Sequence, residues 1–307
     1  WYFSLLALAG VLLLGLVLWR PGKEGRFVRP STRRFLRAGG FRSLLAPRAL
    51  HFYVYARWTM RYLLTAAFVV TRMGRRGKQR WADRYHGKVL PHDHARTLIT
   101  TDKAIPLADL EQIVPYPTAR RFLLETPLEI AVLECPCRLA RKTHCRPTQV
   151  CMIIGQPFVD FVLEHHAGDC RLLTQAEAVE LLEAEHLRGH VHAAWFKDAC
   201  LDRFFAICNC CKCCCGGIEA MVRHSVPMMV SSGYVARVDE ALCVGCGRCQ
   251  EVCPFEAVEV NGQAAVRDEA CLGCGVCVGQ CLEDAVSLVR DPNRPAPLDV
   301  RVLGEGG

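Results

Sequence analysis

Motifs of the common nucleotide-dependent and hydrolytic enzymes are absent from this sequence. It contains no GxGxxG after a strand, no GxxxxGK[ST], no nucleophile elbow and no HExxH. These absences exclude a recognisable flavin or nucleotide site, and a recognisable serine-hydrolase or zinc-protease site. Any chemistry of the chain must therefore rest on other residues.

Cysteine is absent from the first 134 residues, and all 20 cysteines lie between residues 135 and 281. Repeated CxxC spacings are too tight for most disulfide pairings and suit metal chelation instead. We therefore expect reduced, metal-binding cysteines and not a disulfide-stapled scaffold.

Charge is absent from residues 1–19, WYFSLLALAGVLLLGLVLW. A helix of this length just spans a hydrocarbon core of roughly 30 Å, and aromatic residues stand at both of its ends. A signal peptide is the alternative, but neither a basic leader nor a small-x-small cleavage site is visible. We expect a transmembrane helix at 1–19.

Acidic residues are scarce in residues 20–96, where 19 Lys and Arg accompany three acids, a net charge of +16. This basic flank predicts an inner (cytoplasmic) membrane location with the bulk of the chain on the cytoplasmic side. Residues 49–70 are apolar but carry Arg57 and Arg61, which favours an interfacial helix; a core helix with a basic face is the alternative. Without a nucleic-acid-binding motif, we expect no nucleic-acid partner.

A cysteine repeat lies near the end of the chain. CVGCGRCQEVCP begins at Cys243 and CLGCGVCVGQCL at Cys271, so each cysteine recurs 28 residues later. Over residues 234–290 the chain resembles the bacterial two-cluster ferredoxins, whose motif is C-x2-C-x2-C-x3-C-P. Leu282 replaces the proline of the second copy, which affects the local loop and no ligand.

This resemblance implies two [4Fe–4S] clusters with interleaved ligands, because the fourth cysteine of each copy reaches the other cluster. The first cluster would be held by Cys243, Cys246, Cys249 and Cys281. The second would be held by Cys271, Cys274, Cys277 and Cys253. Structural zinc is the alternative, and the interleaved spacing disfavours it.

Ten more cysteines lie in ECPCRLARKTHCRPTQVC (134–151) and CNCCKCCC (208–215). They are Cys135, Cys137, Cys145, Cys151, Cys208, Cys210, Cys211, Cys213, Cys214 and Cys215. The combination of CxCR, two spaced cysteines and CNCCxCCC ahead of a ferredoxin repeat resembles a group of 4Fe–4S binding proteins of anaerobic bacteria. Adjacent side chains diverge, so we expect the two segments together to hold one or two additional Fe–S clusters. Zinc, and a non-cubane or double-cubane cluster, remain alternatives.

A helix is predicted between these segments, in TQAEAVELLEAEHLRGH. Thr174 and Glu177 form a capping box and Gly189 marks the end. An apolar face is predicted at Leu181, Leu182 and Leu187. No spacing singles out a histidine ligand among His144, His165, His166, His190 and His192.

We predict an α+β protein in five parts. They are a transmembrane helix (1–19), a basic juxtamembrane segment (20–96), a mainly helical cysteine-rich metal-cluster domain (97–228), a two-cluster ferredoxin domain (234–290) and a tail (291–307).

The predicted function is a membrane-anchored electron carrier that relays single electrons between a soluble redox partner and a membrane redox complex. It would be a subunit of an oxidoreductase complex and not catalytic alone. One alternative is an oxidoreductase whose catalytic site is an unusual Fe–S cluster at Cys135–Cys151 and Cys208–Cys215. Another is an assembly or sensor subunit with zinc or a labile cluster there.

Overall fold

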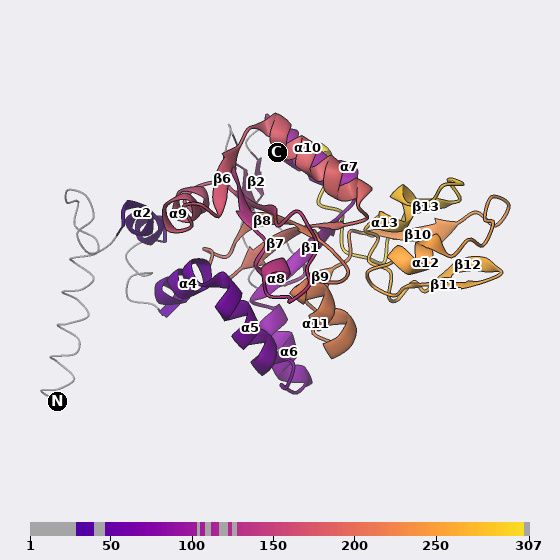
Figure 1. Ribbon diagram of the computed structural model, residues 1–307, viewed down its shortest axis with the longest axis horizontal. Coiled ribbons are helices and arrows are strands. Elements are labelled where there is room, and N and C mark those ends of the chain that lie inside the picture. The colour runs from indigo at the N-terminus through magenta and orange to yellow at the C-terminus, as the bar shows by residue number, and fades with distance from the viewer. Residues whose placement is uncertain are drawn as a thin grey trace, which may run out of the picture.

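The computed structural model describes residues 29–39, 47–102, 105–107, 112–116, 122–124 and 128–303. Its centre is a seven-stranded sheet with the strand order β6-β4-β5-β8-β7-β1-β9 (Figure 1). All neighbouring strands are antiparallel except β1 and β9, which run parallel. The strands are β1 (Tyr85–Leu90), β4 (Ile130–Glu134), β5 (Gln149–Ile154), β6 (Cys170–Leu173), β7 (Val191–Lys197), β8 (Arg203–Cys210) and β9 (Met229–Val230).

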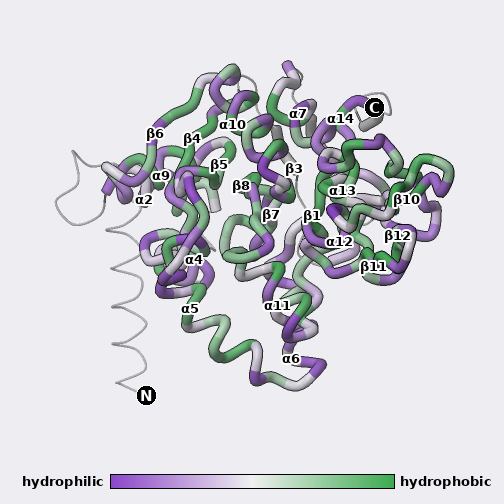
Figure 2. The backbone as a smooth tube through the Cα atoms, turned by 45° about the vertical axis from the view of Figure 1, so that its right-hand side comes forward, coloured by the Kyte–Doolittle hydropathy of each residue, from purple (hydrophilic) through white to green (hydrophobic). Residues whose placement is uncertain are grey.

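Helices cover both faces of this sheet, as two views of the molecule show (Figures 1 and 2). The first face carries α2 (Pro30–Ala38), α4 (Pro47–Arg57), α5 (Thr59–Val70), α6 (Arg75–Ala82), α8 (Pro136–Leu139), α9 (Phe158–His165) and α11 (Gly216–His224). The second face carries α7 (His92–Thr100), α10 (Gln175–Leu187) and α14 (Val300–Leu303). A separate short pair, β2 (Ile105–Leu107) and β3 (Phe122–Leu124), is antiparallel.

Side chains alternate between the two faces along each strand, as the pleat requires. On β7, Ala193 and Trp195 pack in the first-face core, and Ala194 and Phe196 in the second. The same alternation on β8 separates its cysteines from Asn209, which bonds to β7 and β5 on the second face. Cysteine chemistry therefore lies on one side of the sheet.

The C-terminal unit repeats its backbone as well as its sequence. It contains β10 (Tyr234–Val238) paired with β13 (Val286–Arg290), β11 (Val258–Asn261) paired with β12 (Gln263–Val266), and the short helices α12 (Arg248–Val252) and α13 (Val276–Gly279). Helices α12 and α13, like strands β11 and β13, begin 28 residues apart, the same period as the cysteines. The unit lies at one end of the molecule beside α10 (Figures 1 and 2).

Two glycines of this repeat occupy positions that no other residue fits. Gly245 and Gly273 have φ of +67° and +64°, in the left-handed region. A Cβ on Gly245 would lie 1.9 Å from the carbonyl oxygen of Gly262, and one on Gly273 would lie 2.2 Å from that of Tyr234. Backbone contact therefore demands glycine in both cysteine loops.

The predicted fold class is wrong. The cysteine-rich region, expected to be mainly helical, supplies β4 to β8, because side chains on both faces of these segments are apolar and pack into the two cores of a sheet covered on both sides. Among the described residues, no helix is long and apolar enough to cross a membrane. This finding also overturns the predicted inner-membrane location. The segment 1–19, on which both predictions rested, lies outside the described residues.

The stretch 49–70, predicted as one interfacial helix, forms two helices that break at Trp58. In α4, Phe52 and Tyr55 are buried in the core on the first face of the sheet. In α5, Phe68 is largely exposed. The α4 half thus packs as an ordinary core helix.

Helix α10 confirms the predicted capping box. The Thr174 hydroxyl accepts a hydrogen bond from the Glu177 backbone N–H, and the Glu177 carboxylate accepts one from the Thr174 backbone N–H. Its predicted apolar face is only partly right, since Leu182 is buried but Leu187 is exposed. From this helix, the Glu185 carboxylate accepts a hydrogen bond from Arg138 of the first cysteine segment, at 2.7 Å.

Candidate metal centres

The ten cysteines of the middle region divide into two groups in space. Six of them form a closed ring of neighbouring thiols: Cys135, Cys137, Cys151, Cys208, Cys210 and Cys215. The other four form a second group, Cys145, Cys211, Cys213 and Cys214. We call these the six-thiol ring and the four-thiol group. Neither sequence segment supplies a whole group, so each site needs both.

The sheet register assembles the six-thiol ring. Cys151 of β5 pairs directly with Cys208 of β8, and Cys210 ends the same strand. Cys135 and Cys215 stand at the N-caps of α8 and α11, where chain turns bring them toward the strands. Each thiol neighbours two others, and these neighbour pairs run around the ring and close at Cys137.

Burial and the crowding of thiols make this ring a poor place for free thiolates. At each ring cysteine one neighbouring thiol raises the pKa and the other lowers it, and burial adds to the rise, so each pKa lies above its usual range, at about 12 for Cys135 and Cys137. Metal binding to thiolates must therefore release protons from this site. Once its thiols have lost their protons, the six-thiol ring carries negative charge and attracts a positively charged group such as a metal ion or the core of a cluster.

An apolar cavity of about 150 Å³ adjoins the ring. Tyr55 and Phe52 of α4, Tyr85 of β1 and Trp195 of β7 line it together with the ring cysteines. The Trp195 indole N–H is buried and has no hydrogen-bond partner among the residues that the structure describes. Cluster sulfides and cysteine sulfurs accept such bonds, so this orphaned donor fits an iron–sulfur cluster in the ring.

Arg138 places a buried positive charge next to the ring. Its guanidinium is buried and donates to the Glu185 carboxylate at 2.7 Å and to the carbonyl oxygen of Asn209 at 3.2 Å. Although burial opposes it, the bond to Glu185 and the nearby thiols raise the pKa of Arg138. The same guanidinium acts against burial to favour the Cys211 thiolate. Arg138, the arginine of the CxCR motif, thus lies between the two cysteine groups and offsets the negative charge of their thiolates.

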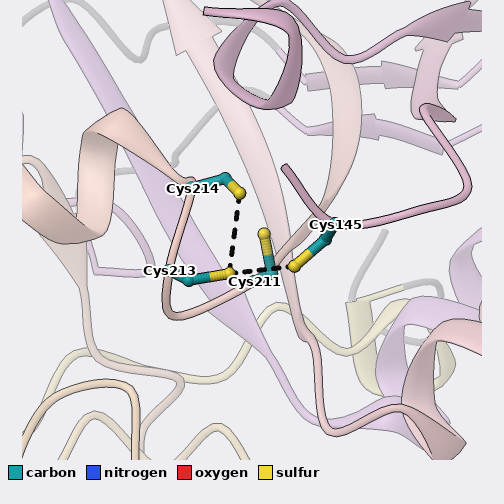
Figure 3. Close-up of side chains that lie close together, drawn as sticks. All are labelled: Cys145, Cys211, Cys213 and Cys214. Atoms are coloured by element: carbon teal, nitrogen blue, oxygen red, sulfur yellow. Dashed lines mark hydrogen bonds between the residues drawn. The ribbon is translucent and has the colours of Figure 1, made fainter. Parts of the chain in front are cut away.

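The four-thiol group is smaller and closer to solvent (Figure 3). All four sulfurs lie within 4.8 Å of one another, and the Sγ atoms of Cys145 and Cys213 are 2.9 Å apart. Burial opposes ionisation of Cys213, but hydrogen bonds from Cys145 and Cys214 outweigh it and lower its pKa. A tetrahedral ion with metal–sulfur bonds of about 2.3 Å holds its sulfurs about 3.8 Å apart, so this group fits a single ion.

Lys212 connects the four-thiol group to the C-terminal unit. It stands between Cys211 and Cys213, and its ammonium donates to the carbonyl oxygen of Glu251 at 2.8 Å. Glu251 lies in α12, between Cys249 and Cys253. The two cysteine-rich regions therefore touch where Lys212 meets α12.

The structure also brings together the interleaved sets that the repeat predicts. Cys243, Cys246, Cys249 and Cys281 line one small cavity. Cys271, Cys274, Cys277 and Cys253 line another. Backbone N–H groups of Ala236 and Ala257 donate to the sulfurs of Cys271 and Cys253, at 3.4 and 3.3 Å. Both sets are placed as cluster ligands would be, and their ligand roles remain predictions.

Comparison with protein families agrees with this arrangement. Residues 236–282 match the 4Fe-4S dicluster domain. The C-terminal unit is therefore a ferredoxin-like iron–sulfur domain. The searches of curated proteins and of solved structures found no match.

Several side chains at these sites carried no sequence signal of their own. The roles of Trp195 and Lys212 could not be predicted from the sequence, because only the fold places them beside the cysteines. Arg138 was visible as the last letter of CxCR, but its buried partner Glu185 lies on another element. Cys170 belongs to neither group, because its thiol donates to backbone carbonyls of α9 and the turn after it.

Proposed function

We propose that this protein is an iron–sulfur electron carrier in which the ferredoxin-like domain exchanges single electrons with a further cluster held by the six-thiol ring. The observation that carries the proposal is the ring itself, in which four buried and two half-buried thiols gather beside an apolar cavity. A purely structural core has no use for six clustered sulfurs. The cluster's thiolate ligands would come from both cysteine segments.

Contacts between the two regions support an internal electron path. Lys212 joins the loop of the four-thiol group to α12, which lies between two predicted cluster ligands. In turn, Cys210 and Cys211 are adjacent in sequence and belong to the ring and the four-thiol group respectively. Electrons passing between the ferredoxin-like domain and the ring would cross this short stretch of chain.

The cavity volume favours a carrier over an enzyme at the ring. Pockets that bind small molecules typically measure roughly 300–1,000 Å³, whereas this cavity measures about 150 Å³. A cluster in the ring would occupy part of that space, which leaves little for a substrate. We therefore place the ring in electron transfer and assign a single tetrahedral ion, zinc or iron, to the four-thiol group.

The acidic ferredoxin-like domain points to the external partner. Residues 234–291 carry ten acidic and four basic residues, a net charge of −6. Such a surface docks a soluble redox protein through a basic patch, and its association slows as salt increases. The partner would donate or accept one electron at a time.

Metal analysis of the protein purified without oxygen tests the proposal. Two clusters in the ferredoxin-like domain and one in the ring predict at least about twelve irons per chain, with matching acid-labile sulfide, since each cubane holds four irons. EPR of the reduced protein should then show a signal beyond those of the ferredoxin pair. About eight irons, with zinc alone elsewhere, would overturn the role of the ring.

A further inference from the structure

Three histidines gather on the face of the sheet opposite the six-thiol ring. His92 begins α7, His186 lies near the end of α10, and His192 belongs to β7. One ring nitrogen of each lies within 4.8 Å of those of the other two. No sequence spacing points to them, because His92 and His192 are 100 residues apart. We call them the histidine group.

The tautomer of His192 is fixed by Asn209. The side-chain amide of Asn209 donates from Nδ2 to the carbonyl oxygen of Val150 at 2.8 Å, so its Oδ1 is the atom that faces His192. Oδ1 lies 2.6 Å from His192 Nδ1 and can only accept. His192 Nδ1 therefore carries the proton, and its Nε2 presents a lone pair.

Glu183 fixes His92 in the same way. A carboxylate oxygen of Glu183 lies 3.1 Å from His92 Nε2, so Nε2 carries the proton and Nδ1 presents a lone pair. That Nδ1 lies 3.3 Å from His192 Nε2. Two lone pairs thus face each other at hydrogen-bond distance, an arrangement that requires a positive charge between or beside them.

We propose that the histidine group binds one divalent transition-metal ion between His92 Nδ1 and His192 Nε2. The ring of His186, which stacks on that of His92 with centroids 4.2 Å apart, turns to supply the third nitrogen. Tetrahedral bonds of about 2.0–2.1 Å to imidazole nitrogen place the nitrogens about 3.3–3.4 Å apart, which matches the 3.3 Å between His92 and His192. Neutral imidazole suits zinc and iron(II). Glu183 and Asn209 are the hydrogen-bond partners that such ligands need in order to hold their orientation.

This site ties together the surface on which the ferredoxin-like domain rests. His186 packs so closely on Gly279 of α13 that a Cβ there would lie 2.7 Å from its Nε2. The next residue, Gln280, donates to the carbonyl oxygen of Leu187 at 3.0 Å. An ion bound to the histidine group fixes α7, α10 and β7 directly beside the loop that carries Cys281. The proposal does not depend on a cluster in the six-thiol ring.

Zinc binding to the purified holoprotein tests the site. The variants His92→Ala and His186→Ala are compared with the wild type and with His224→Ala, whose side chain lies on α11 outside the group. After equilibrium dialysis against zinc, we expect the two group variants to hold one zinc fewer per chain than the control. Unchanged iron content and an unchanged circular dichroism spectrum would show that the variants are folded. If His92→Ala does not fold, His92→Gln takes its place.

X-ray absorption at the zinc edge distinguishes this ion from one in the four-thiol group. The wild type and His224→Ala should show nitrogen scatterers at about 2.0–2.1 Å, which imidazole gives and thiolate at about 2.3 Å does not. The nitrogen shell should disappear in His92→Ala and His186→Ala. If zinc content and nitrogen scattering are the same in all four proteins, or if the wild type shows no nitrogen shell, the two lone pairs share a proton and the metal site is wrong.

Discussion

The ferredoxin-like domain and the six-thiol ring assemble clustered cysteines in opposite ways. In the ferredoxin-like domain, short glycine-containing loops place three cysteines that are close in sequence around each cavity, and the other copy of the repeat supplies the fourth. In the ring, strand register and two helix N-caps bring together cysteines from Cys135 to Cys215. The first arrangement can be read from spacing alone. The second exists only because the sheet is formed, so the proposed cluster in the ring would depend on the fold.

Loss of one cysteine from each region should separate the two sites most clearly. We expect Cys208→Ala to remove the ring cluster, and Cys271→Ala to remove one ferredoxin cluster, so that each variant loses about four irons per chain. The signals retained in EPR should be complementary. Cys170→Ala, outside both groups, is the matched control and should keep the full iron content. Full iron in Cys208→Ala would disprove a cluster ligated by Cys208.

The same difference between local loops and a long-range sheet decides which features of the structure could be predicted from the sequence. The 28-residue repeat correctly predicted a ferredoxin-like domain, because a local motif fixes local loop geometry. Spacing also identified the ten cysteines of the middle region as candidates. It could not divide them, since Cys210 and Cys211 are neighbours in sequence yet point to different groups.

The helical prediction for the middle region failed for a related reason. Helix α10 could be predicted because its capping box and its termination are local signals. Strands buried on both faces, such as β7 (VHAAWFK), do not show the alternation of apolar and polar residues that marks a half-buried strand. Contacts such as His92 with His192, or Arg138 with Glu185, join residues whose nearness no local pattern encodes.

The dependence of the ring on its fold makes Arg138 the next point to perturb. Arg138→Met would leave Glu185 buried with one cationic partner fewer, and breaking a buried ion pair in this way costs about 3–5 kcal/mol. Chemical denaturation followed by circular dichroism measures the loss. For comparison, Arg223 pairs with Glu219 at 3.9 Å on the surface, so Arg223→Met should cost under about 1 kcal/mol. Equal losses in the two variants would contradict a structural role of the buried pair.

Glycine substitutions test the ferredoxin-like domain, where the geometry of short loops determines the positions of the cysteines. Gly245→Ala combines a left-handed φ with a backbone clash, and Gly247→Ala has the left-handed φ but nothing within 4 Å of its new Cβ. We expect Gly247→Ala to cost about 1–2 kcal/mol and Gly245→Ala clearly more, with loss of iron from the ferredoxin-like domain alone. Thermal melting and iron analysis of the two variants test this, and a milder effect at Gly245 would show that the loop is not held against Gly262.

The smallest expected effect on stability comes from the contact between the four-thiol group and the ferredoxin-like domain. This contact lies on the proposed path of electrons. Lys212→Ala removes one bond to the carbonyl oxygen of Glu251, and a single exposed hydrogen bond contributes only about 0.5–1.5 kcal/mol. The ferredoxin-like domain should still be reduced at the normal rate by an external donor. Reduction of the proposed ring cluster, followed by rapid-freeze EPR, should slow because helix α12 is no longer held against the four-thiol group. Lys142→Ala, a surface lysine in the other cysteine segment, is the control, and an unchanged ring rate in Lys212→Ala would place the electron path elsewhere.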